Sequence, residues 1–385
     1  MKKVYYLVHF DDLNKENCRL VSPAAVAKAG YVSKALSQIG FRIQIISPAL
    51  PNKPGKYESS NYEILNGVNL KLFKSFYTNI KIFKAFRRIL LYIHLFLFLL
   101  FELKKDSIFI VYHSLSLVFI VKILKKIKRI KIISDFNEIY GDVVDKPAVS
   151  LKEIRYTKLF NGYFFPSEIL AKIINKDHKP QAIIYGNYEI KPKYNESFND
   201  SLVHVVYSGT LSESKGGAAA VKAAEFLDNN YHLHILGFGS DLEVENITRL
   251  IDNIKLKTKC KISFEGLLLN EEFDRFLQKC DIGLSTQTLT NNFNNTSFPS
   301  KILTYFGNGL KVVSIKIDPV FQSKVSSMIE FYENDSPNDI ANAIVRASGD
   351  KRNNELSDIL KELDLKFKKQ VTEVLNKVYL GGNKC

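Results

Sequence analysis

The segment 295–309 contains a lysine at a position that favours an anionic ligand. Pro299 ends the preceding segment, Ser300 is a good N-cap residue, and Lys301 falls in the first turn of the predicted helix 300–306. A cation at this end of a helix is unfavourable unless a negative ligand binds there too. Backbone N–H groups, a hydroxyl and an ammonium at one point suit a phosphate or a diphosphate. The alternative is a surface helix with an unfavourably placed lysine.

Three further loops follow predicted strands, and we expect them to meet the same site. Loop 208–217 contains Gly209 and, at the start of another helix, Lys215. Loop 237–240 is a glycine turn that leads into a helix, and a plain turn is its alternative interpretation. Loop 265–270 is apolar and suits a planar base, with core packing as its alternative. Ligands of parallel sheets bind at the carboxyl ends of the strands, which is where these loops lie.

The elements that position these loops alternate regularly between strand and helix. In the first half we expect strands at 4–9, 41–47, 62–65, 68–73, 108–112, 130–134, 162–165 and 182–185, with helices at 24–38, 79–103 and 115–126. A polar linker, 187–201, precedes strands 202–207, 232–236, 261–264, 281–285 and 311–315 and helices 216–227, 241–254, 270–279, 337–347 and 353–378. This pattern predicts an α/β protein with two doubly wound Rossmann-like domains, 1–186 and 202–350, that face each other across a cleft. We expect segment 351–385 to pack back on the first domain.

Composition narrows the partners. The 385 residues include 54 basic and 40 acidic side chains, a net charge of +14, which favours nucleic acid, an anionic membrane or a phosphorylated substrate. The sequence has no zinc spacing, RNP-like aromatic pattern or helix-turn-helix motif, so nucleic acid is disfavoured. The four cysteines form no C-x-x-C pair, which indicates a reducing compartment rather than a disulfide framework. The N-terminus lacks the apolar core of a signal peptide, and we expect a buried strand there.

Four segments of the second half resemble, in order and spacing, the donor half of GT-B glycosyltransferases. They are YSGTLSESKGG, LHILGFGSD, ISFEGLLLNEEFDRFLQKCDIGLS and SFPSKILTYFGNGLKVVS. The closest resemblance is to retaining glycosyltransferase family 4, whose opening loop, helix and second strand resemble SPAAVAKAGYVSKALSQIGFRIQIIS. The resemblance covers nearly the whole chain. It implies a GT-B fold and the transfer of a sugar from a UDP- or GDP-sugar. The nucleotide sugar is a substrate, and no cofactor is implied. It also implies a donor site formed by Gly209, Thr210, Lys215, Gly237, Gly266, Leu267, Ser300, Lys301, Ile302 and Thr304.

The sequence departs from this family at the positions of two acids. The family's pair of glutamates, the second of which typically binds the donor ribose, falls on Thr296 and Thr304. Thr210 stands where the family often has an arginine or lysine, and the F-P-S-K loop is a variant found in a subset of these enzymes. No Asp-x-Asp lies between a strand and a loop, so we expect no metal. Lys215, Lys301 and the helix N-terminus would then stabilise the departing diphosphate.

On the acceptor side, segment 135–142 resembles the family's loop in which a histidine or aspartate approaches the acceptor and the sugar. The resemblance suggests Glu138, and next Asp135, for a polar contact or a base, with Asn137 beside them. The alternative is that these are solvated loop acids. His113 follows another strand and is a further candidate, although a lone histidine is more often structural.

The predicted helix 79–103 bears on where this chemistry takes place. Segment 71–105 has eight basic residues and one acid, Glu102, and Ile89 to Phe101 is an uncharged run of thirteen. Such a run is roughly 20 Å long, too short for the roughly 30 Å core of a bilayer, but it suits the interface of an anionic membrane. Segment 122–131 adds six basic residues. We expect residues 79–88 on lipid and the remainder on the sheet, with a buried helix and a solvated basic end as the alternative.

The sequence therefore predicts a cytoplasmic glycosyltransferase at the inner face of the cell membrane, with a lipid-linked or surface-polysaccharide acceptor. The missing glutamates favour a second hypothesis, a non-catalytic relative that binds nucleotide or saccharide and scaffolds a partner enzyme. An inverting or phosphorolytic enzyme of the same fold is a third.

Overall fold

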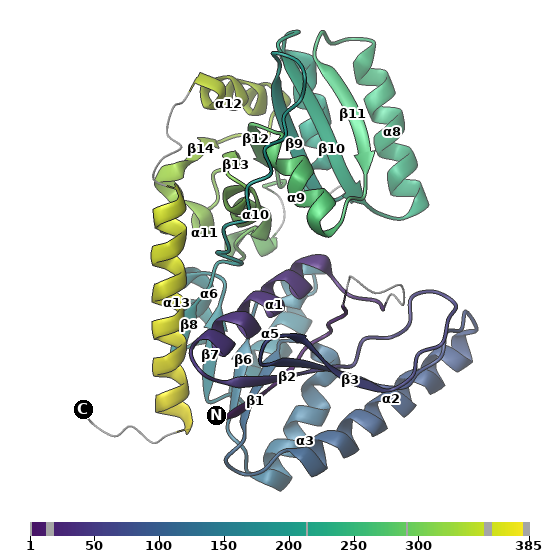
Figure 1. The fold of residues 1–385 in the computed structure, drawn as a ribbon, viewed down its shortest axis with the longest axis vertical. Coiled ribbons are helices and arrows are strands. Elements are labelled where there is room, and N and C mark those ends of the chain that lie inside the picture. Colours follow the sequence, from purple (N-terminus) through teal and green to yellow (C-terminus); the bar gives the residue numbers. More distant parts are fainter. Residues whose placement is uncertain (1, 13–18, 213–214, 290–291, 350–355, 380–385) are drawn as a thin grey trace. The chain divides into compact units, whose positions relative to one another are not determined.

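The computed structural model describes residues 2–12, 19–212, 215–289, 292–349 and 356–379 (Figure 1). The chain divides into two compact units. Unit 1 comprises Met1–Asn187 and Leu365–Cys385, and unit 2 comprises Tyr188–Asp364. Each unit contains one sheet built mainly or wholly from parallel strands, with helices on its faces. The predicted α/β class with two parallel-sheet domains is confirmed.

The sheet of unit 1 has eight strands in the order β3-β4-β2-β1-β5-β6-β7-β8. All neighbouring strands are parallel except β3 and β4, which form an antiparallel pair at one edge. The apolar runs of the central strands are almost entirely buried, as expected for a sheet covered on both faces. The strands are β1 (Lys3–Leu7), β2 (Arg42–Ser47), β3 (Ser60–Leu65), β4 (Val68–Leu72), β5 (Ile108–Tyr112), β6 (Ile132–Asp135), β7 (Gly162–Phe165) and β8 (Gln181–Ile183).

Most helices of unit 1 connect one strand of the sheet to the next strand in the chain. Pro23 starts the first of them at N1, where its missing N–H costs nothing. The C-terminal part of the last helix of the chain also belongs here, because Phe367 packs edge-on against Phe164 and the Tyr379 hydroxyl accepts from the Phe109 N–H. The helices are α1 (Pro23–Gln38), α2 (Lys81–Glu102), α3 (Val118–Lys128), α4 (Tyr140–Val143), α5 (Pro147–Thr157), α6 (Glu168–Ile174) and, from Leu365 on, α13 (Leu356–Tyr379).

The sheet of unit 2 has six parallel strands in the order β11-β10-β9-β12-β13-β14. In chain order this is 3-2-1-4-5-6, the doubly wound arrangement whose switch point lies between β9 and β12. Its strands are β9 (Val203–Thr210), β10 (Tyr231–Phe238), β11 (Lys261–Gly266), β12 (Ile282–Ser285), β13 (Lys311–Ile315) and β14 (Ile329–Tyr332). Its helices are α7 (Gly217–Ala223), α8 (Asp241–Lys255), α9 (Asn270–Gln278), α10 (Ser300–Gly307), α11 (Asp318–Phe321) and α12 (Pro337–Gly349).

The structure corrects the predicted elements in three places. Ser300 is not an N-cap, because α10 begins at Ser300 itself and Pro299 occupies the cap position without a side-chain bond. The predicted helix 216–227 is the shorter α7 followed by a 3-10 turn, Ala224–Phe226. The sequence pattern also did not predict β14 or the helices α4, α5, α6 and α11, which are mostly short.

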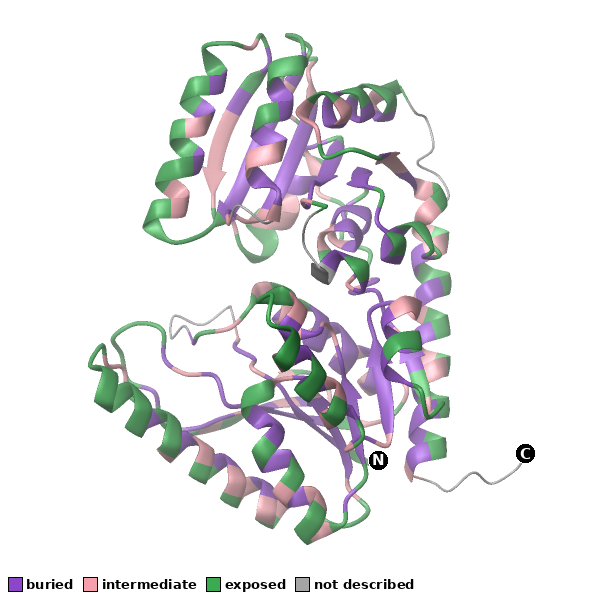
Figure 2. Ribbon diagram, turned by 180° about the vertical axis from the view of Figure 1, so that it is seen from behind, coloured by how far each residue is buried: buried purple, intermediate pink, exposed green. Residues whose placement is uncertain are grey.

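Helix α2 has one buried side and one exposed side (Figure 2). Leu91, Leu95 and Leu99 pack in the core of unit 1, as expected for the second half of the helix. The outer side nevertheless stays apolar along the whole helix, from Ile82, which is 78% exposed, to Phe101, which is 81% exposed. None of the helices in the described ranges has both the length and the apolar character needed to cross a bilayer.

Candidate functional site

Lys301 is the second residue of α10, in the first turn as predicted. Its ammonium lies over the ring of Tyr207 on β9, 4.0 Å from the ring centroid. Burial of the ammonium, and then the nearby charge of Lys215, lower the pKa of Lys301 to about 7. Within the described ranges, no carboxylate is hydrogen-bonded or ion-paired to it. A buried cation without a counter-charge is unfavourable, and an anionic ligand would relieve that cost.

Tyr207 also holds the loop that carries Lys215. Its hydroxyl lies 3.0 Å from the carbonyl oxygen of Thr210 and 2.8 Å from that of Lys215, and its single hydrogen serves one of them at a time. Gly216 closes the loop with φ +90°, and a Cβ there would lie 1.8 Å from the carbonyl oxygen of Thr286. The Thr286 hydroxyl donates to the Gly216 carbonyl at 2.7 Å. The two ends of the loop are therefore fixed at the carboxyl end of β9.

Two glycines bring the backbone close to Lys301. Gly209 has φ +156°, and a Cβ there would lie 3.2 Å from the Lys301 Nζ atom. Its neighbour across the β9–β10 ladder is Gly237, where a Cβ would lie 2.1 Å from the Gly209 carbonyl oxygen. A Cβ at Gly237 would clash with that oxygen, and at Gly209 the positive φ favours glycine. The structure thus brings Gly209, Gly237, Lys215 and Lys301 together.

Tyr305 fixes α10 against the sheet. Its buried hydroxyl accepts from the Ser208 N–H at 2.9 Å and donates to the Leu284 carbonyl at 3.2 Å, which ties α10 to both β9 and β12. Gly283 on β12 permits the close approach, because a Cβ there would lie 2.3 Å from the Tyr305 ring. The position of Lys301 therefore rests on buried contacts of its own helix.

The remaining predicted donor residues have varied surroundings. Gly266, with φ +72°, ends β11, and Leu267 after it is exposed, but no described contact joins either to Lys301. The side chain of Ile302 is buried in the core, and its N–H donates to the Pro299 carbonyl. Thr304 donates its hydroxyl to the Ser300 carbonyl at 3.3 Å, and Thr296 is buried.

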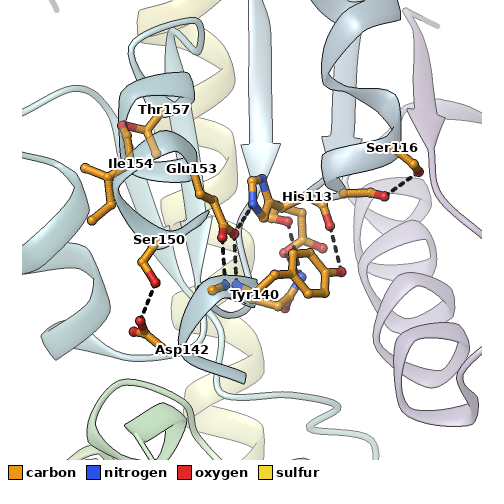
Figure 3. Close-up of polar contacts among 12 residues, drawn as sticks. His113, Ser116, Tyr140, Asp142, Ser150, Glu153, Ile154 and Thr157 are labelled. Atoms are coloured by element: carbon orange, nitrogen blue, oxygen red, sulfur yellow. Dashed lines mark hydrogen bonds and ion pairs between the residues drawn. The ribbon is translucent and has the colours of Figure 1, made fainter. Parts of the chain in front are cut away.

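In unit 1, His113 pairs with Glu153 of α5 (Figure 3). Both side chains are buried, and the His113 Nε2 atom lies 2.5 Å from a Glu153 carboxylate oxygen. The same carboxylate accepts from the N–H groups of Tyr140 and Gly141 at 3.0 and 3.2 Å. The imidazole stacks on Phe136, 4.0 Å between centroids. Glu153 thus fixes the ring, and the Nδ1 atom is left buried without a hydrogen-bond partner among the described residues.

Asp135 at the end of β6 and Glu138 in the loop after it lie in two different environments. Asp135 is fully buried, with one oxygen 2.8 Å from the Lys28 ammonium and the other accepting from the Tyr6 hydroxyl at 2.5 Å. Asn137 accepts from Lys28 and donates back toward Asp135, so it belongs to the same buried group. Glu138 is half-buried. Of the two predicted acids, Glu138 is the more accessible.

Three residues of these clusters were missed from the sequence: Tyr207, Glu153 and Lys28. Tyr207 is an ordinary strand residue by its pattern, and no signal marks it. Glu153 lies in the unpredicted helix α5, whose start Pro147 at N1 is a usable signal. Lys28 interrupts the small and apolar residues of α1, and a lysine among them indicates a buried partner.

No family model matches the chain, and no curated protein matches its sequence. Solved structures do match over nearly the whole length. A sucrose-phosphate synthase from Thermosynechococcus elongatus aligns with TM-score 0.71 and 13% identity over 99% of this chain and all of the other. The Escherichia coli trehalose-6-phosphate structure bound with UDP-2-fluoro glucose aligns with TM-score 0.67 and 12% identity over 97% of this chain and 99% of the other. HepE from Anabaena in complex with UDP aligns with TM-score 0.62 and 13% identity over 98% of this chain and 100% of the other.

The fold is GT-B. At 12–13% identity the likeness shows the fold and not the reaction. GT-B proteins are built from two Rossmann-like domains, and the two parallel-sheet units described above correspond to them.

Proposed function

We propose that this protein is a glycosyltransferase that takes its sugar from a nucleoside-diphosphate sugar bound in unit 2. The observation that carries the proposal is Lys301, a half-buried lysine whose ammonium has a pKa lowered by desolvation and no carboxylate partner in the described structure. Lys215 adds a second positive charge nearby, and Gly209 brings the backbone close to the Lys301 ammonium. This chemistry suits a diphosphate. Two of the proteins with the same fold contain UDP or a UDP-sugar analogue, which agrees with such a donor.

The same groups suit the chemistry of the transfer. As the bond from the sugar to the diphosphate breaks, negative charge builds up on the departing phosphate and positive charge on the anomeric carbon. Lys301 and Lys215 would stabilise the departing phosphate in a partly dry site, where such interactions are strong. The proposed reaction proceeds with retention and without a metal at the diphosphate.

For unit 1 we propose the acceptor role. Glu153 holds His113 in one orientation, and its Nδ1 atom has no partner among the described residues. This nitrogen is buried, so a hydrogen bond from a sugar hydroxyl requires it to become accessible. Glu138 is the accessible acid of the loop after β6. Asp135, buried between Lys28 and Tyr6, is assigned to positioning that loop.

We further propose that α2 lies on an anionic membrane and that the acceptor is lipid-linked or a growing surface saccharide, in a cytoplasmic enzyme at the inner face of the cell membrane. The exposed apolar residues of α2 recur at helical spacing along one side: Ile82, Phe86, Ile89, Ile93, Leu97 and Phe101. Lys81, Lys84 and Arg88 are exposed on the same helix and supply positive charge for acidic headgroups.

A thermal-shift screen against UDP, GDP, CMP and their sugar conjugates, with and without EDTA, tests the donor. A stabilisation by one nucleoside diphosphate that persists in EDTA supports the proposal and names the donor class. The same shift should be lost in Lys301→Met and kept in Lys222→Met, a control at an exposed lysine of α7. No shift with any nucleotide would overturn it.

Sedimentation with vesicles tests the membrane proposal separately. Vesicles rich in phosphatidylglycerol should bind the protein, and pure phosphatidylcholine vesicles should bind it much less. Phe86→Ser, at a half-exposed position of α2, should weaken binding, whereas Phe226→Ser, equally exposed in unit 2, should not. Equal binding of both variants would contradict a role for α2.

The alternative function, a non-catalytic nucleotide- or saccharide-binding scaffold, is favoured by one observation. Threonines stand at the two positions where the resembled family has glutamates, so neither supplies a carboxylate for the donor ribose. Thr296 is buried, and the Thr304 hydroxyl donates to a carbonyl of its own helix. Product analysis separates the two functions: a nucleotide-dependent thermal shift without any transfer or hydrolysis of the donor would favour the scaffold.

A further inference from the structure

Three histidines converge on one face of the sheet of unit 2. His204 on β9 is paired in register with His232 on β10, and His234 follows two residues later on the same face. One ring nitrogen of each lies within 4.8 Å of the other two. His204 and His234 are buried, and His232 is half-buried. The cluster lies nearer the amino ends of these strands than Gly209 and Gly237, so it is separate from the proposed donor site.

Two carboxylates fix the outer nitrogens of this cluster. The His204 Nε2 atom lies 2.8 Å from an Asp200 oxygen, and the His234 Nδ1 atom lies 2.8 Å from a Glu265 oxygen. An ionised carboxylate only accepts hydrogen bonds, so both of these nitrogens must carry their protons. In the neutral imidazoles the lone pairs are then on the His204 Nδ1 and His234 Nε2 atoms. These two atoms face each other at 2.9 Å.

Two facing lone pairs repel each other unless a proton or a metal ion lies between them. The third imidazole is near enough to share a metal ion, because one of its ring nitrogens lies within 4.8 Å of a nitrogen of each other histidine. Its Nε2 atom lies 3.0 Å from the Ser263 hydroxyl. A histidine that donates its far N–H to a carboxylate is the usual arrangement around a bound metal ion. The Phe198 ring stacks on the His204 ring at 3.9 Å between centroids and gives the cluster an apolar cover.

We propose that His204, His232 and His234 bind a divalent transition-metal ion of the zinc class. Neutral imidazole is a preferred ligand of Zn²⁺ and its neighbours in the first transition row. Zinc–nitrogen bonds of about 2.1 Å place tetrahedral ligands about 3.4 Å apart. The facing nitrogens therefore need to separate by roughly half an ångström, and the two rings need to turn so that both lone pairs point at one ion.

The ion would connect the segment that enters unit 2 to the sheet. Asp200 and Phe198 precede β9, and Glu265 is the residue before Gly266 at the end of β11. Binding would thus stabilise this side of unit 2. This inference does not depend on the proposed transfer, because it is tested by metal binding and not by activity.

The first experiment uses the full chain, stripped with EDTA and then titrated with Zn²⁺ or Co²⁺. We expect one ion per chain, a rise in the melting temperature with Zn²⁺, and visible absorption of bound Co²⁺ typical of nitrogen ligands in a four-coordinate site. Absence of binding by wild-type protein would overturn the proposal. In that case a shared proton, rather than a metal, joins His204 to His234.

Variants then locate the ion. His234→Gln should abolish the Co²⁺ absorption and the stoichiometric binding, and Glu265→Gln should weaken Zn²⁺ binding about 10- to 100-fold. His94→Gln, at an exposed histidine of α2, is the matched control and should bind as wild type does. Circular dichroism checks that each variant is folded. Undiminished binding by folded His234→Gln, or loss of binding in His94→Gln, would contradict the proposed site.

Discussion

Unit 1 contains a buried lysine and unit 2 a half-buried one, and the two differ in whether the charge is balanced. In unit 1, Lys28 on α1 is buried against Asp135 at 2.8 Å and also donates to Asn137, so its charge is balanced. In unit 2, the ammonium of Lys301 faces an aromatic ring and a second lysine, and burial and that lysine lower its pKa to about 7. A balanced pair is complete without a ligand. An unbalanced cation needs an anionic ligand as its counter-charge. Because of this contrast, we place the anionic substrate in unit 2.

The largest effect is expected from breaking the balanced pair. Lys28→Met leaves the buried Asp135 without its cation, which should lower the free energy of unfolding by about 3–5 kcal/mol. Chemical unfolding followed by circular dichroism measures this, since the chain has no tryptophan. The double variant Lys28→Met with Asp135→Asn should recover part of the loss, because no unpaired charge remains. Equal loss in the single and double variants would show that the pair is not balanced as described.

Lys301→Met should have the opposite profile. Its removal takes away a group that stabilises the departing phosphate, so turnover should fall about 10²–10³-fold. Stability should not fall, because no buried partner is left unpaired among the described residues. Initial rates with the donor found in the thermal-shift screen, together with a melting curve, measure both. Turnover close to wild type would refute the role given to Lys301.

Glu153→Gln examines the second buried pair of unit 1. The carboxylate accepts from the His113 ring and from two backbone N–H groups, and an amide cannot accept all three. We expect the free energy of unfolding to fall by about 1.5–3 kcal/mol, the range for hydrogen bonds to charged groups. If His113 contacts the acceptor, the KM for the acceptor should rise while the affinity for the donor nucleotide stays unchanged. An equal change in both would contradict the separation of roles between the units.

The sequence predicted the sheet architecture well because the hydrophobic periodicity of each strand and helix, and the glycine and proline residues that end it, are local features. It also predicted that Lys215 and Lys301 would meet, since both follow strand ends that share one edge of a parallel sheet. It did not predict the pairs formed by Lys28 and by His113. Their partners lie 107 and 40 residues away in the chain, and only the packing of α1 and α5 on the sheet brings them together.

The histidine cluster shows the same limit. His232 and His234 alternate with apolar residues, as exposed strand residues do, and His204 stands alone in another strand. Their convergence depends on the register between β9 and β10, which pairs His204 with His232. A shift of that register by one residue would place His204 beside apolar residues. Because both strands are buried on both faces along most of their length, the pattern within each strand specifies this register only weakly.

The smallest effect, and the one that most directly compares free with occupied Lys301, is the pH dependence of nucleotide binding. With a pKa of about 7, the free side chain is mostly neutral above pH 8, whereas a bound diphosphate requires the ammonium. Binding must then take up a proton, so the affinity for the nucleoside diphosphate should fall above pH 7 by up to about tenfold per pH unit. Calorimetry in buffers of different ionisation enthalpy measures the uptake directly.

The stability of the free protein should change in the other direction over the same range. The unfolded chain keeps the Lys301 proton up to its ordinary pKa of 10.5, while the folded protein loses it near pH 7. The unfolded state therefore binds more protons between these values, and the contribution of Lys301 to the free energy of unfolding rises with pH. Lys301→Met should lack both effects, and Lys301→Arg, which stays charged, should bind the nucleotide without proton uptake. Proton uptake that persists in Lys301→Met would assign it to another group and would remove the basis for placing the diphosphate at Lys301.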